Sequence, residues 1–216
     1  MGERKLSHLK VYEFNQIKGL IKELINYYKT NDYLNYALLI KETLLEIGAI
    51  LIEHEIDSQM FMTNLADKRI SHRQVDNLLE DLKVRVEPFT IPSNKEITKL
   101  LRKVKKLKVP DFETYDKKEI IYLAWNEQSS NRKYVIYEDN NKSAAFYGDL
   151  STDKVKGFCK ICKEETETSL FLLKSKTSGD GTYTKKGDYI CRDSAICNQN
   201  LKNIDDFYDF VNHMKA

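Results

Sequence analysis

Apolar residues recur at helical spacing through the first part of the chain. Between residues 17 and 28 they follow one another at intervals of three or four positions, which places them on one face of a helix. Three further stripes of this kind cover residues 37–51, 60–65 and 75–86. Ser71 and Gln74 have the spacing of a capping box at the start of the last stripe. Four helices with short connections predict an antiparallel bundle whose apolar stripes form the core.

Prolines at positions 88 and 92 separate this bundle from the rest of the chain, because proline ends helices and restricts the residue before it. We therefore expect a helical domain over residues 1–90 and a second domain over residues 91–216. Ser93 and Glu96 form another capping box, and the stripe after it predicts a helix over residues 97–108. The polar sides of this helix carry basic residues with no acid among them: Lys99, Arg102, Lys103, Lys105, Lys106 and Lys108.

Short strands are predicted after residue 130. Residues 133–137 are rich in β-branched and aromatic residues, and a turn-prone connector joins them to a return strand over residues 144–147. Residues 169–173 predict another strand, and residues 205–214 predict a final short helix. A helical bundle followed by strands and short helices predicts an α+β fold, with a C-terminal domain of mixed α/β content.

All four cysteines of the chain lie in this C-terminal domain, as Cys159-x2-Cys162 and, 28 residues later, Cys191-x5-Cys197. Two close pairs separated by a loop can surround one tetrahedral Zn²⁺. The first pair fits a knuckle turn. We expect Cys191 at the start of a helix and Cys197 one to two turns later, which is a treble-clef-like arrangement. Two other interpretations remain open: four buried thiols without a metal, and a redox-active C-x2-C pair.

Four thiolates leave no coordination position for a substrate, so the predicted zinc is structural. The sequence contains no P-loop, GxGxxG or GxSxG motif. No histidine has the spacing of a metal site or a catalytic triad: His8, His54, His72 and His213. We therefore expect a protein that is not an enzyme and has no small-molecule substrate.

The N-terminus and the hydropathy of the chain predict a cytoplasmic protein. The net charge of +2 does not imply a general affinity for polyanions. The polar N-terminus has no signal-peptide core, and no segment approaches the ~20 apolar residues of a membrane span. We expect no membrane association and a reducing compartment, in which clustered cysteines are typical of metal sites.

The basic helix allows two interpretations. Its side chains can contact phosphate groups, as nucleic-acid-binding helices do. Alternatively they form a solvated face over an apolar stripe. In the first case the protein is a zinc-finger protein that binds RNA or the ribosome through helix 97–108. The residues that we expect to make such contacts are Lys99, Arg102, Lys103 and Lys106.

Several longer motifs resemble the FusB-type fusidic acid resistance proteins. The similarity is densest in the C-terminal domain, over Trp125-Asn126, Ser130–Tyr134, Val155–Cys162 and Tyr183–Ser194. Pro92-Ser93 and the basic run Arg102–Lys108 are also similar to that family. The N-terminal helices match in pattern more than in identity.

The resemblance implies a two-domain, non-enzymatic protein with a C-terminal four-cysteine zinc finger. Members of the family bind elongation factor G and promote its release from ribosomes stalled by fusidic acid, which is resistance by target protection. The zinc-finger domain contacts the C-terminal domains of the factor, and we expect a monomer. The partner-binding residues carried over to matching positions are Phe158, Lys186, Tyr189 and Phe210.

Local chemistry agrees with part of this assignment. Phe158 adjoins Cys159, and Tyr189 precedes Cys191 by two residues. A metal-bound backbone holds such side chains rigidly, which lowers the entropic cost of binding. Core packing is the alternative role for Phe158 and Phe210.

Overall fold

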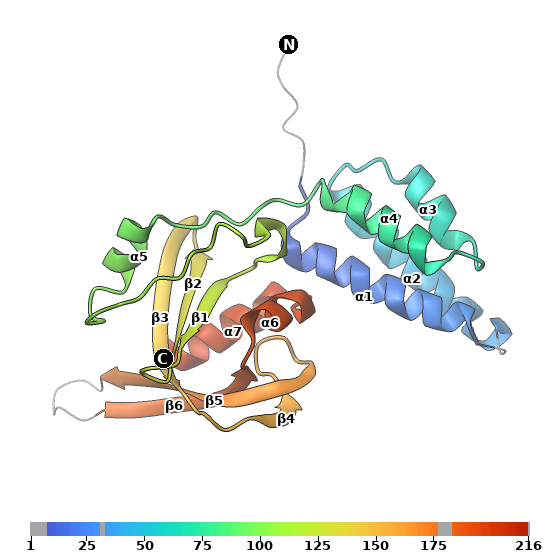
Figure 1. Ribbon diagram of the computed structural model, residues 1–216. Helices are drawn as coiled ribbons and strands as arrows, with labels where there is room; N and C mark the ends of the chain where they lie inside the picture. Colours follow the sequence, from blue (N-terminus) through green and yellow to red (C-terminus); the bar gives the residue numbers. More distant parts are fainter. Residues whose placement is uncertain (1–7, 31–32, 177–182, 216) are drawn as a thin grey trace, which may run out of the picture. The chain divides into compact units, whose positions relative to one another are not determined.

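The computed structural model describes residues 8–30, 33–176 and 183–215 (Figure 1). The chain forms two compact units, Met1–Glu87 and Pro88–Ala216. The first unit is helical, and the second combines a sheet with helices, so the predicted α+β fold class is confirmed. Within the described residues, no helix combines the length and the apolar character that a membrane crossing requires.

The first unit contains the four predicted helices, α1 (Val11–Tyr28), α2 (Tyr33–Glu53), α3 (Gln59–Ala66) and α4 (His72–Lys83). Most residues of their stripes are buried as predicted, with Ile17, Leu24 and Ile47 excluded from solvent, but Ala37 and Met60 are exposed. Ser71 caps α4 through the expected reciprocal bonds with Gln74. Leu9, just before α1, forms a parallel bridge with Val86, just after α4. This bridge closes the bundle, because it joins the two ends of the unit.

The second unit is built on a six-stranded antiparallel sheet. Its strands are β1 (Leu123–Glu127), β2 (Arg132–Asp139), β3 (Lys142–Leu150), β4 (Val155–Phe158), β5 (Glu165–Lys176) and β6 (Tyr183–Cys191). The order is β1-β2-β3-β5-β4, and β6 pairs with β5. The predicted hairpin is β2–β3. Asn140 and Asn141 join its strands with φ of 50° and 58°, as a tight hairpin turn requires.

Both faces of the sheet are buried at the centre of β2, where every residue from 133 to 137 is buried. Val135 and Tyr137 point to one face and pack with α6 (Ser194–Asn200) and α7 (Ile204–Lys215). Tyr134 and Ile136 point to the other face and pack with α5 (Asn94–Leu100) and the segment after it. This segment includes the short 3₁₀ helix η1 (Lys117–Glu119).

The chain's single tryptophan lies on the α5 side of the sheet. Trp125 is buried, and its ring stacks on Tyr134 with 5.0 Å between the ring centroids. Phe112 meets the same indole edge-on at 5.6 Å. These contacts fix the segment between α5 and β1 onto the sheet.

The predicted helix over residues 97–108 is too long, because α5 ends at Leu100. The chain then runs through turns, and Lys106 adopts a left-handed φ of 57°. Like charges three and four positions apart repel each other on a helix, and this run has no acid to offset them. Leu101 is buried while Val104 and Leu107 are half-buried against the sheet. Their packing therefore fixes the segment without a helix.

Close packing between β3 and β5 predicts a steric effect at Gly148. A Cβ atom there meets the Leu172 carbonyl oxygen at 2.5 Å and the buried Phe171 ring at 2.5 Å. We expect Gly148→Ala to lower the free energy of unfolding by about 1–3 kcal/mol, the usual cost of overpacking. Denaturant unfolding measures this change.

Gly157→Ala is the matched control, because a Cβ atom at this strand position meets only Thr168 Oγ1, at 3.6 Å. We expect it to stay within about 0.5 kcal/mol of the parent protein. Equal stability of the two variants contradicts the packing argument.

Candidate metal centre

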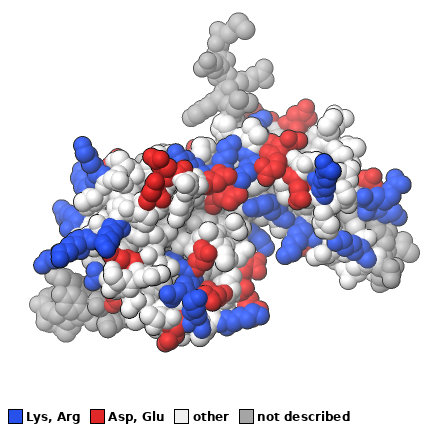
Figure 2. Space-filling view, in the orientation of Figure 1, with Lys and Arg blue, Asp and Glu red and all other residues white. Residues whose placement is uncertain are grey.

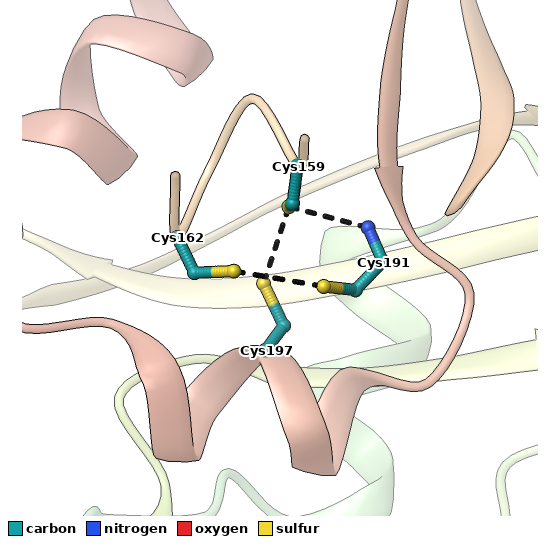
Figure 3. Close-up of side chains that lie close together, drawn as sticks. All are labelled: Cys159, Cys162, Cys191 and Cys197. Carbon is teal, nitrogen blue, oxygen red and sulfur yellow. Dashed lines mark hydrogen bonds between the residues drawn. The ribbon is translucent and has the colours of Figure 1, made fainter. Parts of the chain in front are cut away.

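Four sulfur atoms converge in the second unit (Figure 3). Their positions lie within 4.8 Å of one another, and all four cysteines are buried. Cys159 follows β4, Cys162 lies in the tight turn after it, Cys191 ends β6, and Cys197 lies in α6. The structure thus brings the two predicted pairs together in one cluster.

Cys191 was expected at a helix start, but it is the last residue of β6 and pairs with Thr168 of β5. The helix begins three residues later, where Asp193 caps α6 by accepting a hydrogen bond from the backbone N–H of Ala195 at 2.8 Å. Asp193 therefore sets the start of α6, and strand pairing with β5 fixes the position of Cys191 before it.

The geometry of the cluster fits Zn²⁺. A tetrahedral site with Zn–S bonds of ~2.3 Å has sulfur–sulfur edges of about 3.8 Å. The Cys159–Cys197 and Cys162–Cys191 sulfur distances are 3.7 Å and 3.6 Å. Backbone N–H groups of Ile161 and Cys191 point at the Cys159 sulfur, at 3.3 Å and 3.2 Å. Such donors stabilise a thiolate, which is the form that binds the metal.

Electrostatics inside the cluster also favour a cation. Hydrogen bonding with Cys162 lowers the pKa of the Cys159 thiol. Hydrogen bonding between Cys197 and Cys159 has the opposite effect on Cys197, whose pKa is raised. Negative charge on the Cys159 sulfur thus raises the pKa of Cys162 and Cys197, because like charges at this separation repel. A divalent cation among the sulfurs removes this conflict.

A fully buried lysine supports the backbone next to the cluster. Lys133 of β2 is 0 % exposed. Its ammonium group donates to the carbonyl of Arg192 at 2.9 Å and to Asn126 Oδ1 at 3.1 Å. Burial lowers the pKa of Lys133 to about 8, and negative charge in the cysteine cluster opposes this shift. These two acceptors hold the Lys133 side chain beside the cysteine cluster.

Asn126 and Arg192 complete this arrangement. Asn126 Nδ2 donates to the same Arg192 carbonyl at 3.0 Å. The Arg192 guanidinium donates to the carbonyl of Ser151 at 2.9 Å and to Ser169 Oγ at 3.2 Å. Since Arg192 follows the ligand Cys191, these bonds hold the connection between β6 and α6 in place. We name Lys133, Asn126 and Arg192 the lysine network.

The helix that carries Cys197 is clamped to the sheet by Asn198. This buried amide accepts hydrogen bonds from the backbone N–H groups of Ile121 and Tyr122, at 2.7 Å and 3.1 Å. It returns a hydrogen bond to the Tyr122 carbonyl at 3.0 Å. The clamp and the Asp193 cap leave α6 little freedom, so the fourth sulfur is positioned by the fold.

Phe158 and Tyr189, two of the expected partner-binding residues, are exposed at 74 % and 45 %. They lie on the two chain segments that meet at the knuckle. The backbone N–H of Lys160 donates to the Tyr189 carbonyl at 2.8 Å, and that of Cys159 donates to the Glu164 carbonyl at 3.0 Å. Two large apolar groups are thus presented to solvent on a backbone that the cysteines hold.

Lys186 and Phe210 belong to a different part of the unit. Lys186 is three residues from Tyr189 on β6, so the two side chains point to opposite faces of the strand. Its ammonium group donates to the carbonyl of His213 in α7 at 3.2 Å. Phe210 is 1 % exposed and packs against Phe171. It is a core residue in this structure, which is at odds with a direct contact to a partner.

Sequence reasoning missed the lysine network and the Asn198 clamp. One signal was available, because Lys133 is a charged residue directly before the apolar run Tyr134–Tyr137 of a predicted strand. A lysine in such a strand is buried only when it is paired. Its partners come from β1 and from the end of β6, so no local pattern identifies them.

The chain is similar in sequence and in structure to known proteins. A family model described as "Elongation factor G-binding protein, N-terminal" matches residues 8–90. A solved structure of the fusidic acid resistance protein FusC matches with a TM-score of 0.93 and 46 % sequence identity. That match covers 99 % of this chain and 100 % of FusC. None of the curated proteins compared with the sequence matches it.

The cluster geometry predicts the effect of removing one ligand. We expect Cys159→Ser to abolish stoichiometric zinc binding, measured as zinc per chain by elemental analysis and native mass spectrometry. Zinc binding supplies ~10–16 kcal/mol in small modules, which exceeds the net stability of most domains. The second unit should therefore lose its cooperative melting. Unchanged zinc content and melting contradict the four-cysteine site.

The lysine network predicts a weaker effect on the same metal. We expect Lys133→Met to keep the fold but to weaken zinc affinity by ~10-fold to 100-fold, the usual range for outer-shell changes, and therefore to speed zinc transfer to a competing chelator. Exposed Lys142, on the adjacent strand, gives the control variant Lys142→Met. Circular dichroism confirms that both variants are folded during the assay. Equal transfer rates in the two variants show that Lys133 does not support the site.

Proposed function

The chain belongs to the FusB-type fusidic acid resistance proteins, and we propose that it binds elongation factor G through its second unit. The resemblance in the C-terminal motifs is thereby confirmed at the level of the family. We further propose that Cys159, Cys162, Cys191 and Cys197 hold one structural Zn²⁺. The zinc then stabilises the binding surface and takes no part in a reaction.

The exposed pair Phe158 and Tyr189 is the observation that supports this surface most directly. Both side chains are large, exposed and next to the cysteine cluster, and aromatic anchors supply most of the energy in many interfaces. We name the surface around these two residues the knuckle face. Its backbone is fixed before the partner arrives, so little conformational entropy is lost on binding.

The other two expected residues have different roles in this proposal. Lys186 is half-buried and can contribute charge at the edge of β6. Phe210 acts from the core: it packs under the sheet beside Phe146 and Phe171 and keeps α7 in place. Its substitution therefore tests the stability of the unit more than the contact itself.

Resistance follows from differential affinity. Elongation factor G trapped by fusidic acid is in equilibrium between ribosome-bound and released states. A protein that binds the released or distorted state more tightly shifts the factor away from the ribosome. Each tenfold preference contributes about 1.4 kcal/mol to that shift. In this mechanism the drug is neither modified nor bound by the protein.

The partner surface is assigned to the C-terminal domains of the factor, in line with the family. A monomer in the cytoplasm suffices for this role, because the knuckle face is formed within one chain. The buried thiols of the second unit agree with a reducing compartment.

The knuckle face predicts the effect of two substitutions. We expect Phe158→Ala and Tyr189→Ala each to weaken binding of purified elongation factor G by at least about 30-fold, the loss of a hot-spot residue of ~2 kcal/mol. Because both side chains are exposed, zinc content and melting temperature should not change. Isothermal titration calorimetry measures the binding.

Tyr115→Ala is the matched control, since Tyr115 is 42 % exposed in the same unit but lies in the loop before η1. We expect it to bind like the parent protein. Full binding by a folded Phe158→Ala/Tyr189→Ala double variant excludes the knuckle face as the binding site.

A further inference from the structure

Positive charge is concentrated in one short segment of the second unit. Residues 95–108 contain seven basic residues and one acid, Glu96, which is a net charge of +6. Because the whole chain carries +2, the remaining residues carry a net charge of −4. A solvated helix face normally mixes both signs, so this separation of charge is a specific feature of the molecule. We name residues 95–108 the basic segment.

Every basic side chain of this segment is exposed. Figure 2 shows blue side chains gathered on the side of the molecule where Figure 1 places α5. Among the described residues, no carboxylate forms an ion pair with Arg102, Lys103, Lys105 or Lys106 under a 4.0 Å limit. Their charges are thus available to a partner and are not used to stabilise the fold.

The backbone beneath these charges is well fixed. Ile97 and Leu101 are buried, and Leu100, Val104 and Leu107 pack partly against the same core cluster. The Leu101 carbonyl accepts a hydrogen bond from the backbone N–H of Val104 at 2.8 Å, which closes the first turn after α5. Apolar anchors therefore alternate with basic residues, and the charged groups face solvent while the anchors pack against the core.

We propose that the basic segment is a second binding surface, which contacts the phosphate backbone of ribosomal RNA. Phosphate groups repeat along RNA at short intervals, so they complement several cations held along one strip of backbone. Lysine and arginine dominate such contacts because both donate several hydrogen bonds to phosphate oxygens. This surface goes beyond the proposed function, since it gives the protein a second partner, RNA, besides the elongation factor G that binds at the knuckle face.

The two surfaces give different dependence on salt. Counterion release makes RNA binding fall steeply with ionic strength, with a slope of roughly −0.7 to −0.9 per phosphate contact in a log–log plot. Binding through the aromatic knuckle face depends on salt only weakly, because it removes apolar area from water. The basic segment does not contain Phe158 or Tyr189, so each surface can be changed separately.

The test uses the full zinc-loaded chain and purified ribosomes that carry no elongation factor G. The variant Arg102→Gln/Lys103→Gln/Lys106→Gln removes three exposed charges and no apolar contact. We expect its ribosome affinity to fall ~10-fold or more near 0.15 M salt and its salt slope to become shallower by about 2–3. A second measurement with a structured RNA duplex shows whether the phosphate backbone is the target.

The matched control is Lys22→Gln/Lys41→Gln/Arg73→Gln, which removes two lysines and one arginine from exposed positions of the helical unit. It changes the net charge of the chain by the same amount. We expect the control variant to differ less from the parent protein, in ribosome affinity and in salt slope, than the segment variant does.

Two outcomes overturn the proposal. Equal slopes and affinities for the segment variant and its control show that the segment has no specific role. Loss of elongation factor G binding off the ribosome, with RNA binding unchanged, shows that the segment contacts an acidic protein surface. Phe158→Ala/Tyr189→Ala separates the two hypotheses, because it should lose the factor while keeping the salt-dependent binding to ribosomes.

Discussion

Convergence of four cysteine sulfurs is the constraint on which the second unit depends. The sulfurs join the knuckle turn after β4, the end of β6 and one turn of α6, although Cys159 and Cys197 are 38 residues apart. Their side chains also belong to the apolar core that includes Phe171 and Phe207. Closing such long loops is entropically unfavourable for a chain of this size. The proposed Zn²⁺, bound by all four sulfurs, would offset that cost and fix the loops at once.

The rest of the unit transmits this constraint to the surface. Lys133 and Asn126 bind the carbonyl next to Cys191, and Asn198 ties α6 to the start of β1. The β1–β2 hairpin is therefore connected to the ligand loops by hydrogen bonds as well as by packing. Phe158 lies at one end of this frame and is held by its neighbours, so its exposure is not a sign of local disorder. The proposed binding surface is thus a consequence of how the core is closed.

The sequence predicted those features of the fold that depend on residues close together in the chain. The helical stripes, the caps at Ser71 and Ser93 and the β2–β3 hairpin depend on residues within a few positions of each other, and all are present. The cysteine spacing likewise indicated one cluster, since thiolates in two close pairs have few other uses in a reducing compartment. The end of α5 at Leu100 was missed because the packing of Leu101 onto the sheet decides it. The partners of Lys133 also depend on contacts between distant segments, which periodicity does not encode. Core packing of Phe210 was one of the two roles considered for it, and only the family resemblance favoured a contact with the partner.

The position of the single tryptophan has a practical consequence. Trp125 is stacked on Tyr134 in the sheet-containing unit, and the helical unit has no indole. Intrinsic fluorescence excited at the red edge therefore reports on one half of the chain, while far-ultraviolet circular dichroism is dominated by the helices of the other half. Unfolding recorded by both signals separates the two units without any label. It reveals whether Cys159→Ser affects only the unit that contains the four cysteines.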